Sequence, residues 1–343
     1  MSVLRALTDK SAQPVRGRWG RALTTTALAV SVCAGTGFVG ITPAHAVSGS
    51  APAPAPSFSV GASPLGVVFS KDSSRAYVAN ADDDSVSVIR VSDNTVLSTV
   101  PVGPRPHGIA VSPNGAKVYV TSETTAQVSV IRTSDNAVTS IAVGSGGGGV
   151  AINPKFDKAY VTNFDTSTVS VIRVSTDTVI GTIAVGRRPF GVAFSPDGTK
   201  AGVANQSDGT VSGISVSNDK VVVSIPVGGA PEHGSFSPDG TKAYVTSPQN
   251  NLVSVIDVST RKVVKTIAVD ANPIGLAFSP DGSKAYVASF SGSRRISVIK
   301  VSNDTRLPSI QVGSGPHQVA FSPDGSKAYV ANYYDDTVSV IYP

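Results

Sequence analysis

The side chains best suited to catalysis or metal binding are three histidines and a glutamate. They occur at or beside one position of a repeating unit. Every unit opens with a valine, and the position five residues later is His107, Glu232 or His317 in three of the units, while His233 directly follows Glu232. Imidazole and carboxylate groups around one opening suit a hard or borderline divalent metal ion, or a general acid–base pair. These four residues are therefore the candidate catalytic residues and the candidate metal ligands.

A structural role explains the same residues, and we favour it. Pro106-His107-Gly108 is then a favourable way to start a strand, with the imidazole ring hydrogen-bonded to a backbone carbonyl, as in many structural histidines. The sequence alone leaves both roles open.

The loops that lead into these positions, and the polar loops in the middle of each unit, also carry cations and aromatic rings. The arginines are Arg105, Arg187, Arg188, Arg294 and Arg295. The rings are Phe164, Phe190, Phe290, Tyr333 and Tyr334. Guanidinium groups beside exposed rings suit an anionic polymer or a carboxylated ligand, although solvated loop arginines are also common. The candidate ligand-binding set is Arg105, His107, Arg187, Arg188, Phe190, Glu232, His233, His317, Tyr333 and Tyr334.

The sequence contains no linear catalytic signature. It lacks His-Glu-x-x-His, the Gly-x-Ser-x-Gly elbow and the P-loop, and the glycine run at 146–149 has no following lysine to help bind a phosphate. The loop aspartates lack the alternating spacing of a calcium loop. These absences weaken the case for an enzyme without closing it, because a site built from several repeats leaves no linear motif.

The strands and turns that must position these side chains form a sequence repeat. Each copy holds an apolar run, a Ser-Pro-Asp-Gly type turn, a Lys-Ala-Tyr-Val type run, a polar loop, a Val-Ser-Val-Ile type run, a Ser-Asp-Asn type turn and a fourth apolar run. The copies therefore predict four short strands each and no amphipathic helix. They open at Val60, Val102, Val143, Val185, Val227, Val269 and Val312, with spacings of 42, 41, 42, 42, 42 and 43 residues.

Seven four-stranded copies of this length predict radial repetition around an axis. The ends of the repeat argue against a linear solenoid, which would need polar caps. The last copy stops at Pro343 after its third strand, whereas Pro56–Val60 aligns with the missing fourth strand. The predicted fold is all-β, a seven-bladed β-propeller whose N-terminal strand completes the C-terminal blade. Its first strands line the axis, and the loops named above share one rim.

The second strands carry a family resemblance. They read Tyr-Val-Ala/Thr-Asn/Ser in six copies, as at 77–80, 160–163 and 329–332, whereas the fourth copy has Gly202 in place of the tyrosine. This resembles the YVTN family of β-propeller repeats and implies the same fold. The family includes surface-layer proteins and partners of quinoprotein systems, with lactonase-like enzymes among more distant propellers, so the resemblance does not fix an activity.

The first 46 residues have the features of a secretory signal peptide. Basic residues precede an apolar stretch at 22–41, and Ala44-His45-Ala46 predicts cleavage after Ala46. An uncleaved anchor is the alternative, but threonines and glycines make the stretch weakly apolar for a span. Residues 47–55 then form an Ala/Pro linker and 56–343 the propeller.

Cleavage leaves 28 − 5 = 23 basic and 23 − 1 = 22 acidic residues, so the mature chain is almost neutral. Its charge gives no argument for a nucleic-acid partner.

Two functions fit these observations. The first is a secreted or cell-surface binding or scaffold module that presents its variable rim to an extracellular or cell-envelope ligand. The second is a lactonase-like hydrolase or lyase with a metal or acid–base site at the axial entrance. We favour the first. No cofactor is evident, and a divalent metal is the one that the candidate site could hold. We expect a monomer without a membrane span after cleavage.

Overall fold

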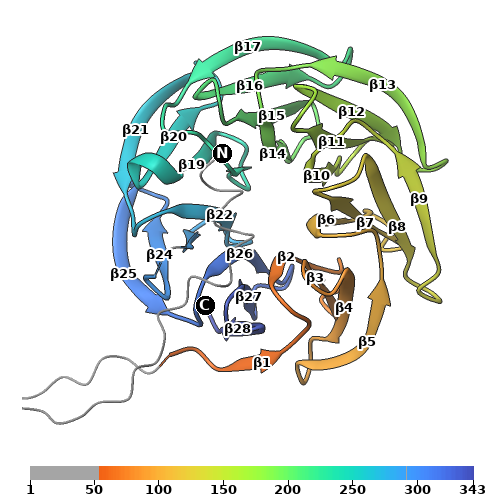
Figure 1. The fold of residues 1–343 in the computed structure, drawn as a ribbon. Coiled ribbons are helices and arrows are strands. Elements are labelled where there is room, and N and C mark those ends of the chain that lie inside the picture. The colour runs from red at the N-terminus through yellow and green to blue at the C-terminus, as the bar shows by residue number, and fades with distance from the viewer. Residues whose placement is uncertain (1–53, 291) are drawn as a thin grey trace, which may run out of the picture. The chain divides into compact units, whose positions relative to one another are not determined.

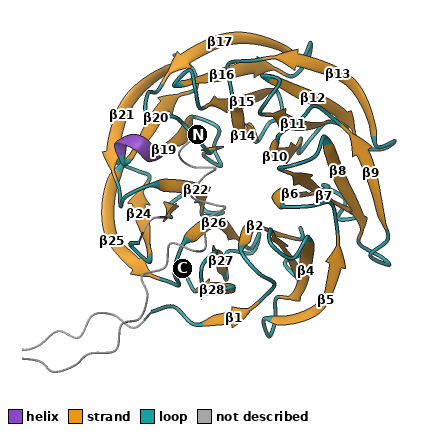
Figure 2. Ribbon diagram, viewed as in Figure 1, coloured by secondary structure: helices purple, strands orange, loops and turns teal. Residues whose placement is uncertain are grey.

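The protein is all-β, and the computed structural model describes residues 54–290 and 292–343. Seven four-stranded antiparallel sheets stand as blades around a central axis (Figures 1 and 2), which confirms the predicted fold class. In the described residues the only helix is the 3₁₀ turn η2 (Pro248–Asn250), and no helix there has the length and apolar character needed to cross a bilayer. The predicted signal peptide and most of the predicted linker lie outside the described residues.

Each blade takes four strands in chain order, except for the last. Blade 1 consists of β2 (Pro64–Phe69), β3 (Arg75–Asn80), β4 (Ser85–Arg90) and β5 (Thr95–Pro101), and blade 2 of β6 (Pro106–Val111), β7 (Lys117–Ser122), β8 (Gln127–Arg132) and β9 (Val138–Ala142). Blade 3 consists of β10 (Gly147–Ile152), β11 (Ala159–Asn163), β12 (Thr168–Arg173) and β13 (Thr178–Ala184), and blade 4 of β14 (Pro189–Phe194), β15 (Lys200–Asn205), β16 (Thr210–Ser215) and β17 (Lys220–Pro226). Blades 5 to 7 consist of β18 (Gly234–Phe236), β19 (Lys242–Ser247), β20 (Leu252–Asp257) and β21 (Lys262–Ala268); β22 (Pro273–Phe278), β23 (Lys284–Ser289), β24 (Arg295–Lys300) and β25 (Thr305–Gln311); and β26 (Pro316–Phe321), β27 (Ala328–Asn332) and β28 (Thr337–Ile341), completed by β1 (Ser57–Ser59).

The Ser-Pro-Asp-Gly turns are held closed by hydrogen bonds to their own side chains. In blade 4, the Ser195 hydroxyl donates to Asp197 at 2.5 Å, and the same carboxylate accepts the backbone N–H of Thr199 at 3.0 Å. Gly198 has a φ of 72°, a conformation that favours glycine because it has no Cβ. The turn between the first and second strands therefore follows from local sequence, as predicted.

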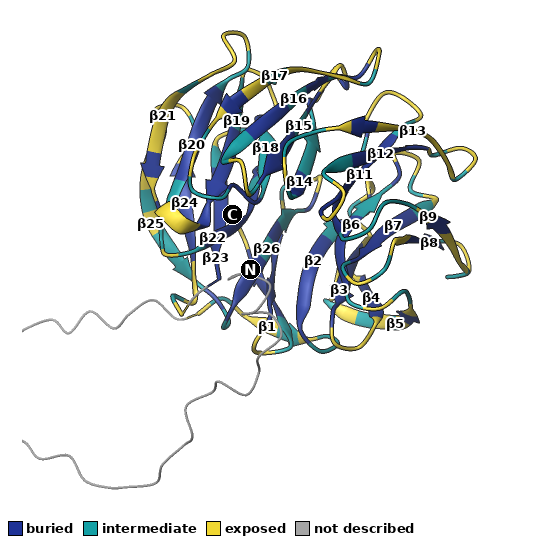
Figure 3. Ribbon diagram, turned by 45° about the horizontal axis from the view of Figure 1, so that its top comes forward, coloured by how far each residue is buried: buried dark blue, intermediate teal, exposed yellow. Residues whose placement is uncertain are grey.

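The core lies between the faces of neighbouring blades. The first strand of each blade is innermost and the fourth is outermost, so side chains become more exposed from the axis outward (Figure 3). One cluster joins Tyr160 and Val171 of blade 3 to Val203 and Ile214 of blade 4, and similar clusters lie between other neighbouring blades. Since the apolar runs are buried against the next copy and not within their own, a single repeat could not fold alone.

The N-terminal strand closes the ring. Phe58 pairs with Val338 in antiparallel register, and the Pro56 carbonyl accepts the backbone N–H of Val340 at 2.7 Å. The backbone contact begins one residue before the predicted boundary, because the Ala55 N–H donates to the Gln311 carbonyl at 2.9 Å. This confirms the predicted closure.

The turn face is the face that carries the turns between first and second strands and between third and fourth strands. On this face, a Lys-Tyr-Asp cluster joins several of the blades to the next blade. At the contact between blades 2 and 3, the Lys117 ammonium lies 2.7 Å from the Asp177 carboxylate, and the Tyr119 hydroxyl donates to the same group. The equivalent sets at other blade contacts are Lys158, Tyr160 and Asp219; Lys242, Tyr244 and Asp304; and, with an amide as acceptor, Lys327, Tyr329 and Asn94.

The contact between blades 4 and 5 departs from this pattern. Gly202 occupies the tyrosine position, and Arg261 occupies the position of the acceptor. The sheets themselves are unchanged, because Gly202 still pairs with Gly213 in the regular register of β15 and β16. The missing tyrosine therefore changes local packing and not the architecture.

Candidate functional site

The residues five positions after each opening valine form one buried layer around the axis. Six of them occupy the second position of an innermost strand, and Glu232 precedes the short strand β18. The structure thus brings the catalytic and metal-binding candidates together, but it buries three of them, with His107 2%, Glu232 1% and His317 1% exposed, and half-buries His233. The whole layer is Leu65, His107, Gly148, Phe190, Glu232, Ile274 and His317.

A recurring glycine explains how the innermost strands come so close. A Cβ built on Gly191 would lie 2.4 Å from the Glu232 carbonyl oxygen of the next blade, and one built on Gly66 would lie 2.3 Å from the His107 carbonyl oxygen. Such distances exclude any side chain, since backbone cannot yield. The glycine that follows each layer residue was a signal available in the sequence. Its equivalents are Gly66, Gly108, Gly149, Gly191 and Gly275, whereas blades 5 and 7 have His233 and Gln318.

The histidines and their aromatic neighbours fill the axis as a plug, which we define as His107, Phe190, His233, His317, Phe290 and Tyr333. The ring of His107 lies 4.9 Å from Phe190 and 5.3 Å from His317, both edge-on. His317 in turn lies 5.7 Å from Phe290. These separations are those of packed aromatic pairs. Phe190, Phe290 and Tyr333 are buried, contrary to the expectation of exposed rings on the rim.

Burial holds the plug histidines in the neutral form. It lowers the pKa of His107 to about 4 and that of His233 to about 3, and it lowers the pKa of His317 well below its usual value. Loss of solvation is the main cause, and the other histidines lower the pKa of His233 and His317 further. Both ring nitrogens of His107 and of His317 are buried without a well-formed hydrogen bond, so the predicted bond to a backbone carbonyl is not made in good geometry.

Glu232 is held in the protonated form at neutral pH. Burial, followed by the charge of Glu123, raises the pKa of Glu232 to about 8. Glu123 is not among the residues predicted from the sequence; its side chain is 7% exposed and lies 3.2 Å from the Nε atom of Arg105. Arg105 also contacts Asp82 at 3.1 Å. Arg105 is therefore occupied by carboxylates of its own chain.

The remaining rim residues divide into paired and stacked groups. Arg187 lies 2.6 Å from Asp208, yet its side chain is 73% exposed, so water screens that ion pair. The guanidinium carbon of Arg188 lies 5.0 Å above the ring of Phe164. Tyr334 is 36% exposed. In the predicted ligand-binding set, Arg187 and Tyr334 are therefore exposed, and Arg188 is half-buried but, unlike Arg105, is not paired with a carboxylate of the described residues.

The histidines and Glu232 lie close together, but no metal-binding group is found among the described residues. In residues 54–290 and 292–343, no three histidine, cysteine, aspartate or glutamate side chains converge in a way that could hold a metal ion. His107 and His233 are stacked with their centres 6.3 Å apart, and the rings are packed against phenylalanine instead of being directed at a common point. The chemistry that the plug supports best is apolar closure of the axis.

Comparison with known proteins supports the fold. No protein-family model and no curated protein sequence matches the chain, whereas many solved structures do. One of them, a chain of Kuenenia stuttgartiensis hydrazine synthase, superimposes with a TM-score of 0.76 at 24% identity, over 82% of this chain and 96% of that chain. At this identity the similarity shows the fold alone. The chain is therefore a β-propeller by structure, and its function has to be argued from its own residues.

Proposed function

We propose that this protein is an exported binding or scaffold module of the YVTN type and not a lactonase-like enzyme. The observation that carries the proposal is the filled axial entrance: His107, Glu232 and His317 are buried, His233 is half-buried, and the imidazole rings pack against aromatic rings. Loss of solvation keeps these groups uncharged at neutral pH. An acid–base or metal site needs contact with its substrate. A buried plug instead gives the rim a rigid base, on which differing loops can hold binding residues in place.

The rim around Arg187, Arg188 and Tyr334 is the proposed binding surface, for a carboxylated polymer of the cell envelope. Guanidinium groups bind carboxylates with paired hydrogen bonds, and the tyrosine adds a flat apolar contact. The adjacent Asp208 competes for Arg187, so we expect weak binding that depends on several sites along the polymer.

We expect polygalacturonate, as the probe, to bind the protein and to lose about tenfold in affinity when both Arg187 and Arg188 are changed to alanine. The matched control changes Arg132 and Arg173 to alanine, which removes two exposed arginines at the turn-face ends of β8 and β12. Titration calorimetry at low salt is the measurement. Equal losses in the two variants would show that only overall charge matters and would remove the rim as the binding surface.

Export and the absence of a resident metal can be checked together. Native mass spectrometry of the secreted protein should give the mass of the chain from Val47 onward, without a bound metal, because Ala44-His45-Ala46 precedes the cleavage point and the plug imidazoles do not converge. A mass increase of one metal ion that is lost in the His107→Ala, His317→Ala double variant would support the hydrolase instead. A retained leader would contradict the proposed cleavage.

A further inference from the structure

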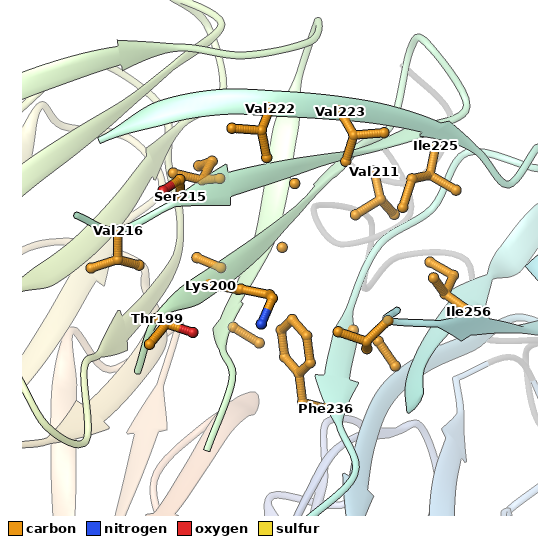
Figure 4. A pocket seen from close by; sticks show the side chains of 18 of the residues that line it. Thr199, Lys200, Val211, Ser215, Val216, Val222, Val223, Ile225, Phe236 and Ile256 are labelled. Carbon is orange, nitrogen blue, oxygen red and sulfur yellow. The ribbon is translucent and has the colours of Figure 1, made fainter. Parts of the chain in front are cut away.

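The contact between blades 4 and 5 encloses a cavity of about 750 Å³ where the Lys-Tyr-Asp cluster is missing. In other blade contacts the tyrosine ring packs on a phenylalanine of the next blade, as Tyr160 does on Phe194 at 4.6 Å and Tyr244 on Phe278 at 4.8 Å. At the contact between blades 4 and 5 the corresponding phenylalanine, Phe236 of blade 5, faces Gly202 of blade 4 and lines the cavity (Figure 4). The volume lies in the range of small-molecule sites.

The backbone does not require a glycine at position 202. A Cβ placed there would meet Val211 at 3.6 Å and Phe236 at 3.8 Å, which are ordinary contacts, and the residue has no positive φ. The open space is therefore a consequence of the missing side chain and not of backbone geometry. A larger side chain at position 202 should be accommodated by filling the cavity.

The cavity wall is apolar and elongated. It runs from the innermost strands, at Gly191 and Gly234, past Val211 to Val223 and Ile225 of the outermost strand β17. Strand spacing makes that path about 14 Å long. An unbranched apolar chain fits a slot between two sheets of this kind better than a globular group does.

Three cations line the cavity near the turn face, namely Lys158, Lys200 and Arg261, and only Lys158 is in an ion pair. Lys200 occupies the position of the paired lysines in the other blades, and Figure 4 shows its side chain reaching toward the ring of Phe236. Its counterpart Lys158 binds Asp219 at 2.8 Å, but the residue in the place of that aspartate is Arg261. Within the described part of the chain, neither the Lys200 ammonium nor the Arg261 guanidinium makes a hydrogen bond or an ion pair with a carboxylate. The substitution thus replaces an acceptor with a second donor.

We propose that this cavity binds a fatty acid, with the carboxylate at Lys200 and Arg261 and the alkyl chain between blades 4 and 5. Lys200 and Arg261 are exposed cations without a hydrogen bond or ion pair to a protein carboxylate, and beside an apolar slot they match an anionic head on an apolar tail. The bound carboxylate would take the place of the missing aspartate, and the chain would fill the space of the missing tyrosine. The site lies on the turn face and is independent of the rim, so its failure would leave the rim proposal untouched.

The test is calorimetric titration of the full chain with dodecanoate, below its micelle concentration. We expect one bound molecule per chain, and a loss of at least about tenfold in affinity for Gly202→Tyr, because the tyrosine fills the slot. The matched control is Gly202→Ala, whose single methyl makes only ordinary contacts and should leave affinity within about twofold. Thermal unfolding checks that Gly202→Tyr is as stable as the parent chain or more so.

Head-group recognition is tested with a second pair of measurements. Changing Lys200 and Arg261 together to glutamine should weaken dodecanoate about tenfold and leave dodecanol, which has the same chain without the charge, unchanged. No binding of dodecanoate, or equal binding by a folded Gly202→Tyr variant, would overturn the site. Equal losses for acid and alcohol in the glutamine variant would overturn the assignment of the carboxylate.

Discussion

A chain that begins at residue 61 will unfold roughly 10 °C below one that begins at residue 54, because it lacks the strand that closes the ring. Phe58 is half-buried and packs edge-on against the core residue Tyr329, with ring centres 5.4 Å apart, and Val60 packs against the same cluster. Removing them exposes apolar surface worth on the order of 3–5 kcal/mol. It also leaves β28 as an unpaired edge, which favours association between chains.

Differential scanning calorimetry of the two truncated chains measures this effect. The chain that begins at residue 54 keeps the Ala55 and Pro56 backbone hydrogen bonds to Gln311 and Val340, so it should match a chain that begins at residue 47. Equal unfolding temperatures for the chains that begin at 54 and 61 would show that β1 does not hold the ring together.

Acid will destabilise the protein in a pH window set by the plug. The unfolded chain protonates its histidines as the pH falls below about 6.5. Folded His107 stays neutral down to about pH 4, and folded His233 down to about pH 3. Because the unfolded state binds more protons in this window, the free energy of unfolding falls as the pH is lowered, by on the order of 3 kcal/mol for His107 alone.

Glu232 produces the opposite slope at higher pH. Its carboxyl is protonated in the folded state up to about pH 8 but ionises near pH 4.5 in the unfolded chain, so stability falls as the pH rises between these values. The maximum should therefore lie where the two slopes balance. Guanidinium unfolding at a series of pH values measures both slopes.

Two substitutions separate the contributions. His107→Phe keeps an aromatic ring beside Phe190 and His317 and should flatten the acid slope, while Glu232→Gln should flatten the alkaline one. The turn aspartates do not confuse the result above about pH 4, because the pKa of Asp197 and that of Asp281 are lowered to about 2 by their turn hydrogen bonds. An unchanged acid slope in His107→Phe would show that the plug histidines do not control it.

The repeat, the four strands per copy and the closing strand could all be predicted from the sequence, for a physical reason. Ser-Pro-Asp-Gly turns and period-two apolar runs act over a few residues, and the same local signals recur at a nearly constant spacing. The alignment of Pro56–Val60 with the missing fourth strand then required only ring closure, which the pairing of Phe58 with Val338 confirms.

The axial layer was also predictable as a position, but its burial was not. His107, Phe190 and His317 come from three different blades, and whether their rings line an open mouth or fill it depends on how closely the innermost strands approach. That distance is set by contacts between copies, such as Gly191 against the Glu232 carbonyl, which no local pattern expresses.

Gly202 likewise appeared in the sequence as a departure from the repeat. Only the tertiary structure decided that this departure leaves a cavity, because the space depends on Phe236 and Arg261 of the next blade. The space left by a missing side chain in one sheet is filled or stays open according to the side chains of the facing sheet.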